Sequence, residues 1–336
     1  MTASLAQRLE WLRRSGILAD DGGVHAFIDE RTGQHAYQYS EITGYFLTLT
    51  AKLARVQGAD DWAHLAKRAG QWLLREAVQP NGAVLCRKYG SVDQGESDPF
   101  SFAHGRTCLF DLAVVGRGLL SAGLAYDEPA FVAAARQIGG FYRGVLETRE
   151  AREWPAVVRA ADGAPVELGP GWSRRFGTYQ LKGVLFLRGL GDAQRLENRL
   201  LEYARALPFE HELHPHLYAL EGLLTLAEAQ ASTTLLGECH DALTHAFEHL
   251  TLQRADVLAQ ALRAHSLLHR LAPRLPDPLA HRIPDLQAAL ETWTLPSGGT
   301  AYGTEHPQHA NAWAHFFAID ELLSRQHLQT SPLEIV

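Results

Sequence analysis

Apolar residues recur along nearly the whole chain at the three- and four-residue spacing of amphipathic helices, and Gly, Pro and Asp interrupt the pattern where helices end. The pattern predicts twelve helices, at residues 3–14, 40–57, 60–78, 104–124, 128–147, 173–190, 192–206, 214–230, 233–250, 254–271, 277–294 and 309–326. Strand signals are short: residues 24–39 alternate around a Thr-Gly turn and predict a β-hairpin, and 82–90 and 298–304 predict weaker ones. The expected fold is therefore all-α, with short β-hairpins in the loops.

The predicted helices alternate in character. Every second one is apolar almost all round, for example "EITGYFLTLTAKLA" and "YALEGLLTLAEA", whereas the intervening ones are amphipathic, for example "DDWAHLAKRAGQWLLRE". A helix that is apolar on every side must be buried on every side, so the alternation predicts hairpins of one inner and one outer helix. Because no Pro/Ser-rich linker or shift in composition divides the chain, we expect a single domain over residues 1–336.

Six such hairpins resemble the six-hairpin, or (α/α)6 toroid, superfamily. The likeness covers nearly the whole chain and depends on the number of hairpins and on the inner-helix segments "GRGLLSAG", "LEGLLTLAE" and "HANAWAHFFAIDELL". The superfamily includes many glycoside hydrolases, several polysaccharide lyases and the N-acylglucosamine 2-epimerases, so the resemblance implies a carbohydrate-active toroid. Terpenoid and lanthionine cyclases are related toroids, but the chain lacks an Asp-rich cyclase box and the Cys-Cys-His zinc pattern.

Composition narrows the partners. The net charge of -7 over 336 residues leaves no basic stripe for nucleic acid, and no apolar run reaches the length of a membrane span. The first residues lack an apolar signal core, and Cys86, Cys108 and Cys239 are scattered without a disulfide framework or paired metal-ligand spacing. The histidines of "HELH" are three apart, where the helical zinc motif HExxH places them four apart. We therefore expect a cytoplasmic protein with no metal, no cofactor, no nucleic-acid partner and no membrane partner.

Polar side chains form columns on the segments that are predicted as inner helices. His214, Tyr218 and Glu221 follow one another at spacings of four and three, which places them on one helical face. Similar columns are Glu41–Tyr45–Thr48, Arg175–Tyr179–Lys182 and Asp256–Gln260–Arg263, with shorter ones at Thr107–Asp111 and Asn311–His315. In a toroid they would line a central polar cavity, which we expect Glu41 and Tyr179 to share with the His214 column. The alternative is that they are structural hydrogen bonds between packed helices, with Glu221 and Lys182 in ion pairs.

The loops that lead into these helices are rich in aromatic and basic residues, which suit a saccharide. Aromatic rings stack on the apolar face of a sugar, and Arg174 and Arg175, which follow "GPGW", favour a negatively charged substrate group. The expected substrate-binding residues are Tyr39, Tyr45, His104, Arg106, Trp172, Arg174, Arg175, Tyr179, His216, Tyr218, Glu221, Tyr302, Asn311 and Trp313.

Catalysis is expected from two carboxyl groups. Glycoside hydrolysis uses one protonated and one ionised carboxyl. Glu41 lies beside Tyr39 and Tyr45, whose rings would raise its pKa and make it the proton donor, with Asp256 or Asp111 ionised opposite. The sequence thus favours a glycoside hydrolase for a small saccharide that can carry an anionic group.

Histidines support other reactions. His214 and His309 could act as an acid–base pair near neutral pH, as a sugar epimerase, an isomerase or a polysaccharide lyase requires. A toroid that binds a saccharide without turnover is a further alternative.

Overall fold

The computed structural model describes residues 3–58, 60–90, 92–191, 194–207, 212–277, 279–326 and 331. The chain divides into two compact units. The first, called the 36–208 unit here, comprises Leu18–His25 and Ala36–Pro208. The second, called the 209–336 unit, comprises Met1–Ile17, Ala26–His35 and Phe209–Val336. The expectation of a single domain over residues 1–336 stays a prediction.

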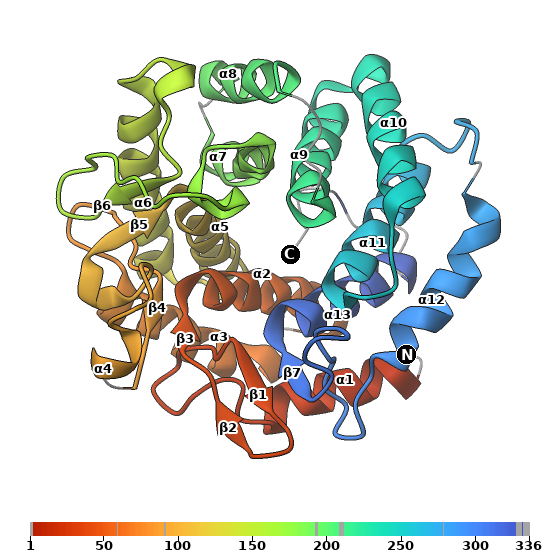
Figure 1. The fold of residues 1–336 in the computed structure, drawn as a ribbon, viewed down its shortest axis with the longest axis horizontal. Coiled ribbons are helices and arrows are strands. Elements are labelled where there is room, and N and C mark those ends of the chain that lie inside the picture. Colours follow the sequence, from red (N-terminus) through yellow and green to blue (C-terminus); the bar gives the residue numbers. More distant parts are fainter. Residues whose placement is uncertain are drawn as a thin grey trace. The chain divides into compact units, whose positions relative to one another are not determined.

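Helices make up most of the 36–208 unit (Figure 1). Its described α-helices are α2 (Ser40–Gln57), α3 (Asp60–Trp72), α4 (Val92–Gly95), α5 (Leu109–Ala125), α6 (Pro129–Glu147), α7 (Val184–Leu190) and α8 (Gln194–Arg205). Short π- or 3-10-helical segments are η1 (Leu73–Ala77), η2 (Phe102–His104), η3 (Ala151–Glu153), η4 (Trp172–Arg174) and η5 (Thr178–Gly183). Two antiparallel ribbons lead into α2 and α5: β3 (Gln38–Tyr39) pairs with β4 (Arg87–Lys88), and β5 (Arg106–Cys108) pairs with β6 (Val157–Arg159).

Glycine allows α2 and α5 to pack closely against each other. A Cβ atom added at Gly118 would lie 2.2 Å from the carbonyl oxygen of Gly44, and one added at Gly44 would lie 2.8 Å from the Cα of Val115. Neither position has room for a side chain, so the glycines of "EITGY" and "GRGLL" serve the helix contact. This contact joins the second turn of α2 to the middle of α5.

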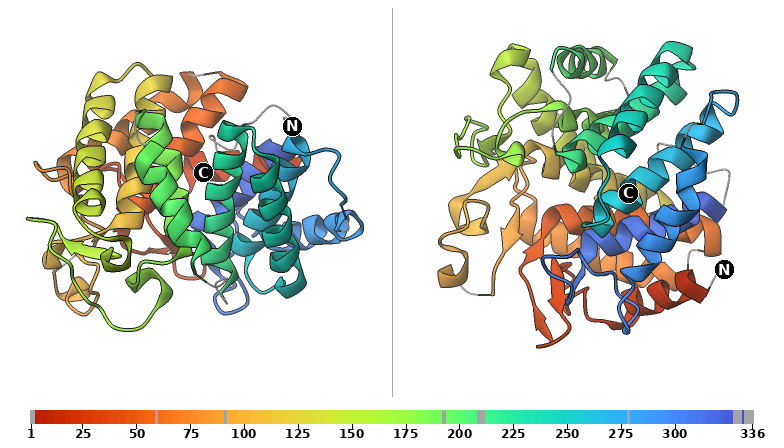
Figure 2. Two further views of the ribbon diagram at one scale, coloured as in Figure 1. Left: turned by 90° about the horizontal axis from the view of Figure 1, so that it is seen from above. Right: turned by 45° about the vertical axis from the view of Figure 1, so that its right-hand side comes forward.

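The 209–336 unit has the same helical character. Its described helices are α1 (Ala3–Arg14), α9 (Leu213–Gln230), α10 (Thr233–His249), α11 (Ala255–Leu271), α12 (Ile283–Thr292) and α13 (Ala312–Gln326), with the 3-10 turn η6 (Ala280–Arg282). A three-stranded antiparallel sheet has the order β2 (Gln34–His35), β1 (Phe27–Asp29), β7 (His309–Asn311). Within this unit α11 packs against both α9 and α13 (Figure 2).

Burial alternates along the chain as the hydrophobic pattern predicts. α2 buries every residue from Ser40 to Ala54, and α13 every residue from Ala314 to Ser324. The neighbouring α10 buries one face only, made of Leu235, Cys239, Ala242, Leu243, Ala246 and Phe247. The distinction between fully buried and half-exposed helices is therefore confirmed. Among the described residues, no helix combines the length and apolar character needed to cross a bilayer.

Each predicted helix has a counterpart, so the all-α prediction is confirmed, but some boundaries are wrong. The segment 173–190 is not one helix, because the chain is extended at Arg175 and Gly177 between η4 and η5. α12 begins only at Ile283, where Pro284 occupies the first turn, a position that suits proline because its missing N–H would have no partner there. Residues 106–108 are a strand, so α5 begins at Leu109 instead of at 104.

The hairpin predictions are partly right. Residues 27–29 and 34–35 pair across the Thr-Gly turn as expected. The hairpin expected at 82–90 is wrong, because β4 pairs with β3 from a distant part of the chain. At 298–304 the structure has isolated bridges only, from Thr300 to Thr294, from Ala301 to Ala310 and from Gly303 to Arg254.

Candidate active site

Two buried carboxyl groups lie at the helix entrances of the 36–208 unit. Glu41 is in the first turn of α2 and Asp111 in the first turn of α5, and they are 5 % and 4 % exposed. Each of these helices follows directly on a strand, since Tyr39 ends β3 and Cys108 ends β5. Both carboxyls act electrostatically on the phenols of Tyr37 and Tyr39 and raise their pKa values, in addition to the effect of burial. The two acids therefore share one aromatic neighbourhood.

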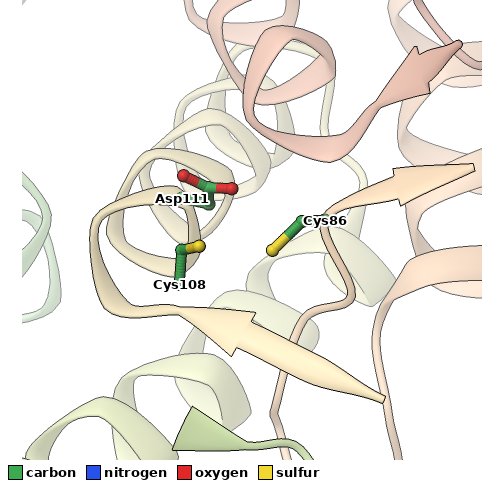
Figure 3. A group of neighbouring side chains, drawn as sticks. All are labelled: Cys86, Cys108 and Asp111. Carbon is green, nitrogen blue, oxygen red and sulfur yellow. The ribbon is translucent and has the colours of Figure 1, made fainter. Parts of the chain in front are cut away.

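Asp111 is surrounded by groups that control its proton. Burial and the adjacent Cys86 sulfur raise its pKa well above the ordinary range, while the Tyr39 phenol donates a hydrogen bond to it and acts in the opposite direction. Figure 3 shows the sulfur atoms of Cys86 and Cys108 beside the carboxyl, each from a different segment. We expected Asp256 or Asp111 to be the ionised member of the pair, and this role stays a prediction. The raised pKa of Asp111 instead favours its protonated form, because a buried carboxylate loses hydration.

Arg87 lies across the same aromatic cluster. Its guanidinium is 4.9 Å from the ring centre of Tyr39, 5.0 Å from that of Tyr37 and 5.1 Å from that of Phe100. Its Nη1 donates to Asp98 Oδ2 at 3.1 Å, and these negative and phenolic neighbours raise the pKa of Arg87. Sequence reasoning missed Arg87 because its partner in the ladder, Tyr39, is far away in the chain. The one sequence signal was the basic "CRKYG" segment.

The aromatic residues of this unit that were predicted to bind substrate pack against each other. Tyr179 makes an edge contact with Trp172, with ring centres 5.1 Å apart, and its hydroxyl donates to the carbonyl of Arg175 at 2.8 Å. Lys182 Nζ donates to the Tyr45 hydroxyl at 3.2 Å. Arg175 is exposed and lies outside the helix, so the expected Arg175–Tyr179–Lys182 column on one helical face is wrong.

Three residues of the 36–208 unit that were predicted to bind substrate contact the carbonyl groups of loops. Arg174 donates to Leu168 at 3.2 Å, and Arg106 donates to Pro99 at 3.0 Å. The Nε2 of the exposed His104 lies 3.0 Å from the carbonyl oxygen of Glu96. These contacts fix the loops in front of α5 and η5, and substrate binding by the three residues stays a prediction.

His214 is the best-defined base candidate in the 209–336 unit. It lies in the first turn of α9, with Nδ1 2.6 Å from Gln260 Oε1 and 3.6 Å from Asp256 Oδ2. Because the amide oxygen only accepts, Nδ1 carries the proton in this bond. Tyr218 packs against the His214 ring, with centres 4.4 Å apart. This arrangement holds the imidazole in one tautomer.

Asp256 is held in an ion pair. Arg254 binds both of its carboxylate oxygens, Nε at 3.1 Å and Nη2 at 2.6 Å. The guanidinium also lies 5.0 Å from the ring centre of Tyr302, whose pKa is raised to about 12, chiefly by burial and by Asp256. Asp256 is therefore a bidentate partner of Arg254 in this structure, which makes it a weaker catalytic candidate than Asp111.

The deeper polar residues form a buried network. Arg263 of α11 donates to Glu221 of α9 and, through Nη1 at 2.8 Å, to Asp320 of α13. All three residues are fully buried. The prediction that Glu221 belongs to an ion pair is confirmed, and this pairing gives Glu221 a structural part in joining three helices.

Three other histidines of this unit that the sequence singled out each contact a different part of the structure. His309 stacks between Phe27 and His306, with ring centres 4.2 Å and 4.6 Å away. His216 is directed to α10, where its Nε2 is 2.8 Å from the carbonyl oxygen of Ala242. His315, expected to continue a column above Asn311, instead reaches the carbonyl of Arg8 on α1.

Two further residues that were predicted to bind substrate lie at the start of α13. Asn311 Oδ1 accepts from the backbone N–H of Ala314 at 3.1 Å, as a cap of α13 does. Trp313 is half-buried in the first turn of α13. Pairing of His214 with His309, and one cavity shared by the columns of both units, stay predictions.

Two clusters of described residues bring potential metal ligands within 4.8 Å of one another. One is Cys86, Cys108 and Asp111, and the other is His245, Glu248 and His249 on α10. Spacing in the sequence did not reveal the first, because strand pairing assembles it. The second has the spacing H-x-x-E-H, a signal that was present in "HAFEH" and was missed.

Neither a protein-family model nor a curated protein sequence matches the chain. Solved structures do. A sugar epimerase from a ruminal bacterium superposes with a TM-score of 0.72 at 10% identity, over 97% of this chain and 98% of that chain. The fold is an (α/α)6 toroid.

Two further structures agree. A D-mannose isomerase has a TM-score of 0.68 at 12% identity, over 96% of this chain and 97% of that one. An inactive variant of an α-1,6-mannanase from Salegentibacter, with two aspartates changed to asparagine, has a TM-score of 0.63 at 7% identity, over 97% of this chain and 100% of that one. The expected six-hairpin fold is thus confirmed, and identities this low establish the fold alone.

Proposed function

We propose that the protein is a carbohydrate-active enzyme, and specifically a glycoside hydrolase with Asp111 as general acid and Glu41 as the second carboxyl. The observation that carries the proposal is the pair of buried acids at adjacent helix entrances, of which Asp111 has a strongly raised pKa. Glycosidases need one carboxyl that is protonated at neutral pH and one that is ionised. Compared with the sequence-based expectation, the role of proton donor moves from Glu41 to Asp111.

The surroundings of Asp111 suit the departure of its proton. When Asp111 protonates the glycosidic oxygen, the resulting carboxylate is stabilised by the hydrogen bond from Tyr39 and by the positive charge of Arg87, both of which favour its ionised form. Glu41 then acts on the sugar ring, either directly as nucleophile or through a water molecule as base. Fixed donors that stabilise charge as it develops are an effective source of catalysis.

The nearby side chains favour a saccharide that carries a negative charge. Arg87 and Arg174 lie on the ring of Phe100, with guanidinium carbons 5.1 Å and 6.0 Å from its centre. Trp172 and Tyr179 supply aromatic surface in the same unit. One fold neighbour is an α-1,6-mannanase that is inactive when two aspartates are replaced by asparagine, and this supports a saccharide hydrolase that depends on carboxyl groups.

The test is hydrolysis of a panel of neutral and acidic oligosaccharides by wild type, Asp111→Asn and Glu41→Gln. Each variant should lose at least about a hundredfold in kcat, the scale of general acid–base catalysis, with substrate affinity nearly unchanged. Asp285→Asn is the matched control, because Asp285 is an exposed aspartate in the first turn of α12. Near-normal turnover by Asp111→Asn would refute the proposal.

A sugar epimerase or isomerase is the second candidate, because His214 is held by a hydrogen bond from Nδ1 to Gln260 and lies against Tyr218. Two fold neighbours, the sugar epimerase and the D-mannose isomerase, support this class. Incubation with aldoses in deuterated water distinguishes the two reactions. Deuterium at the carbon next to the carbonyl, lost in His214→Gln and retained in Asp111→Asn, would favour the epimerase.

A further inference from the structure

We propose that the outer helix α10 carries a binding site for a zinc ion, formed by His245, Glu248 and His249. One ligand atom from each of the three side chains lies within 4.8 Å of the others. Two imidazole nitrogens and a carboxylate oxygen form a ligand set that zinc accepts, with water completing four-coordination. None of these residues takes part in the proposed hydrolase site, so the two proposals stand or fall separately.

The helix itself sets the spacing. Residues three and four apart lie one above another on one face, so His245, Glu248 and His249 project together from a single turn of α10. The two imidazole rings are 4.4 Å apart between centres. Zinc needs nitrogen ligands at about 2.0–2.1 Å, a separation that small rotations of the rings supply without movement of the backbone. The histidine spacing of four is the one that "HELH" lacks.

The protonation state of His249 suits a ligand. Its Nδ1 donates to the carbonyl oxygen of His245 at 2.9 Å, so Nε2 keeps a free lone pair. A metal-binding histidine commonly donates its second nitrogen to a carbonyl in this way, which fixes the ring orientation. The ring of His245 is supported in turn by His216, with centres 5.5 Å apart.

Buried residues hold this turn of α10 in place, and the proposed zinc ligands face solvent. Ala246 and Phe247, between the ligands in sequence, are fully buried and hold this turn of α10 in place. His245 is half-buried, whereas Glu248 and His249 are exposed, so an ion enters directly from solvent. An open site on a fixed helix turn predicts reversible binding of one zinc ion.

Titration calorimetry with zinc on the full chain tests the proposal. Wild type should bind one ion at this site, and His245→Gln/His249→Gln should weaken that binding by at least about tenfold. The matched control is His265→Gln/His269→Gln, a histidine pair with the same spacing on α11, in which His265 Nε2 already bonds to Asp277 at 2.9 Å. Unchanged affinity and stoichiometry in the α10 variant would overturn the site.

Cobalt binding gives a second measurement, which starts from the spectrum of the wild-type chain. Four-coordinate cobalt with nitrogen and oxygen ligands shows visible d–d bands but no sulfur charge-transfer band in the near ultraviolet, and this is the expected spectrum. An intense near-ultraviolet sulfur-to-cobalt band that disappears in Cys86→Ser but persists in Cys239→Ser would place the ion at Cys86, Cys108 and Asp111 and overturn the proposal.

Discussion

Replacement of Arg263 by methionine tests the buried network that joins α9, α11 and α13. The guanidinium is fully buried and donates to both Glu221 and Asp320, which are fully buried too. Methionine fills much of the same volume but removes the guanidinium charge from both carboxylates. The Gln260 amide donates to Glu221 at 3.5 Å, and so long a bond replaces little of the lost interaction.

The expected loss is large. Removing one partner of a buried ion pair costs about 3–5 kcal/mol, because the remaining charge stays buried without compensation. For a unit of roughly 150–250 residues, 1 kcal/mol corresponds to a shift of about 2–4 °C, so the midpoint should fall by about 6–20 °C.

Differential scanning calorimetry at pH 7 measures the effect. Arg14→Met is the control, because Arg14 is 81% exposed and its pair with Glu10 should contribute less than about 1 kcal/mol. The triple variant Glu221→Leu/Arg263→Met/Asp320→Leu should recover most of the lost stability, since apolar residues replace buried ion pairs at little cost. A shift of less than about 2 °C in Arg263→Met, or no recovery in the triple variant, would refute the reasoning.

Three further predictions follow from other contacts. Gly118→Ala should lower the thermal midpoint by several degrees, because its Cβ would lie 2.2 Å from the Gly44 oxygen, whereas Gly140→Ala, with nothing within 4 Å, should leave it unchanged or raise it; the reverse order contradicts the packing. Tyr39→Phe removes a donor to the Asp111 carboxylate, so the alkaline limb of the pH–rate profile, where Asp111 loses its proton, should move to higher pH, and an unmoved limb would exclude this role. Arg174→Ala/Arg175→Ala should weaken binding of an acidic saccharide far more than of its neutral analogue, and equal losses for both ligands would remove the anion preference.

The fold was predictable because hydrophobic periodicity is a local signal. Segments such as 40–57 and 233–250 carry their burial in their own sequence, and their helices match the prediction within one residue. The predicted helix boundaries were wrong where the backbone angles of one or two residues interrupt a helix, as at Gly177. They were also wrong where a proline fixes the first turn, as at Pro284. Pairing of strands of two or three residues leaves no periodic trace, so the β3–β4 ribbon was not foreseen.

The candidate site was only partly predictable for the same reason. Glu41 and Asp111 were identified from their place at the start of apolar helices, and the structure puts both beside Tyr39. Their relative proton affinities depend on burial and on Cys86, which strand pairing brings to Asp111. Polar columns identified residues on shared faces but could not distinguish a ligand from a structural pair, as Glu221 shows.

The most direct test of the hydrolase proposal compares two leaving groups in Asp111→Asn. A saccharide with a sugar or alkyl leaving group needs protonation of the glycosidic oxygen, whereas a dinitrophenyl glycoside departs without it. On the proposed mechanism, Asp111→Asn should lose at least about a hundredfold in kcat/KM on the first substrate and remain within a few-fold of wild type on the second. Equal losses on both substrates, or near-normal hydrolysis of the first, would contradict the assignment of Asp111 as the general acid.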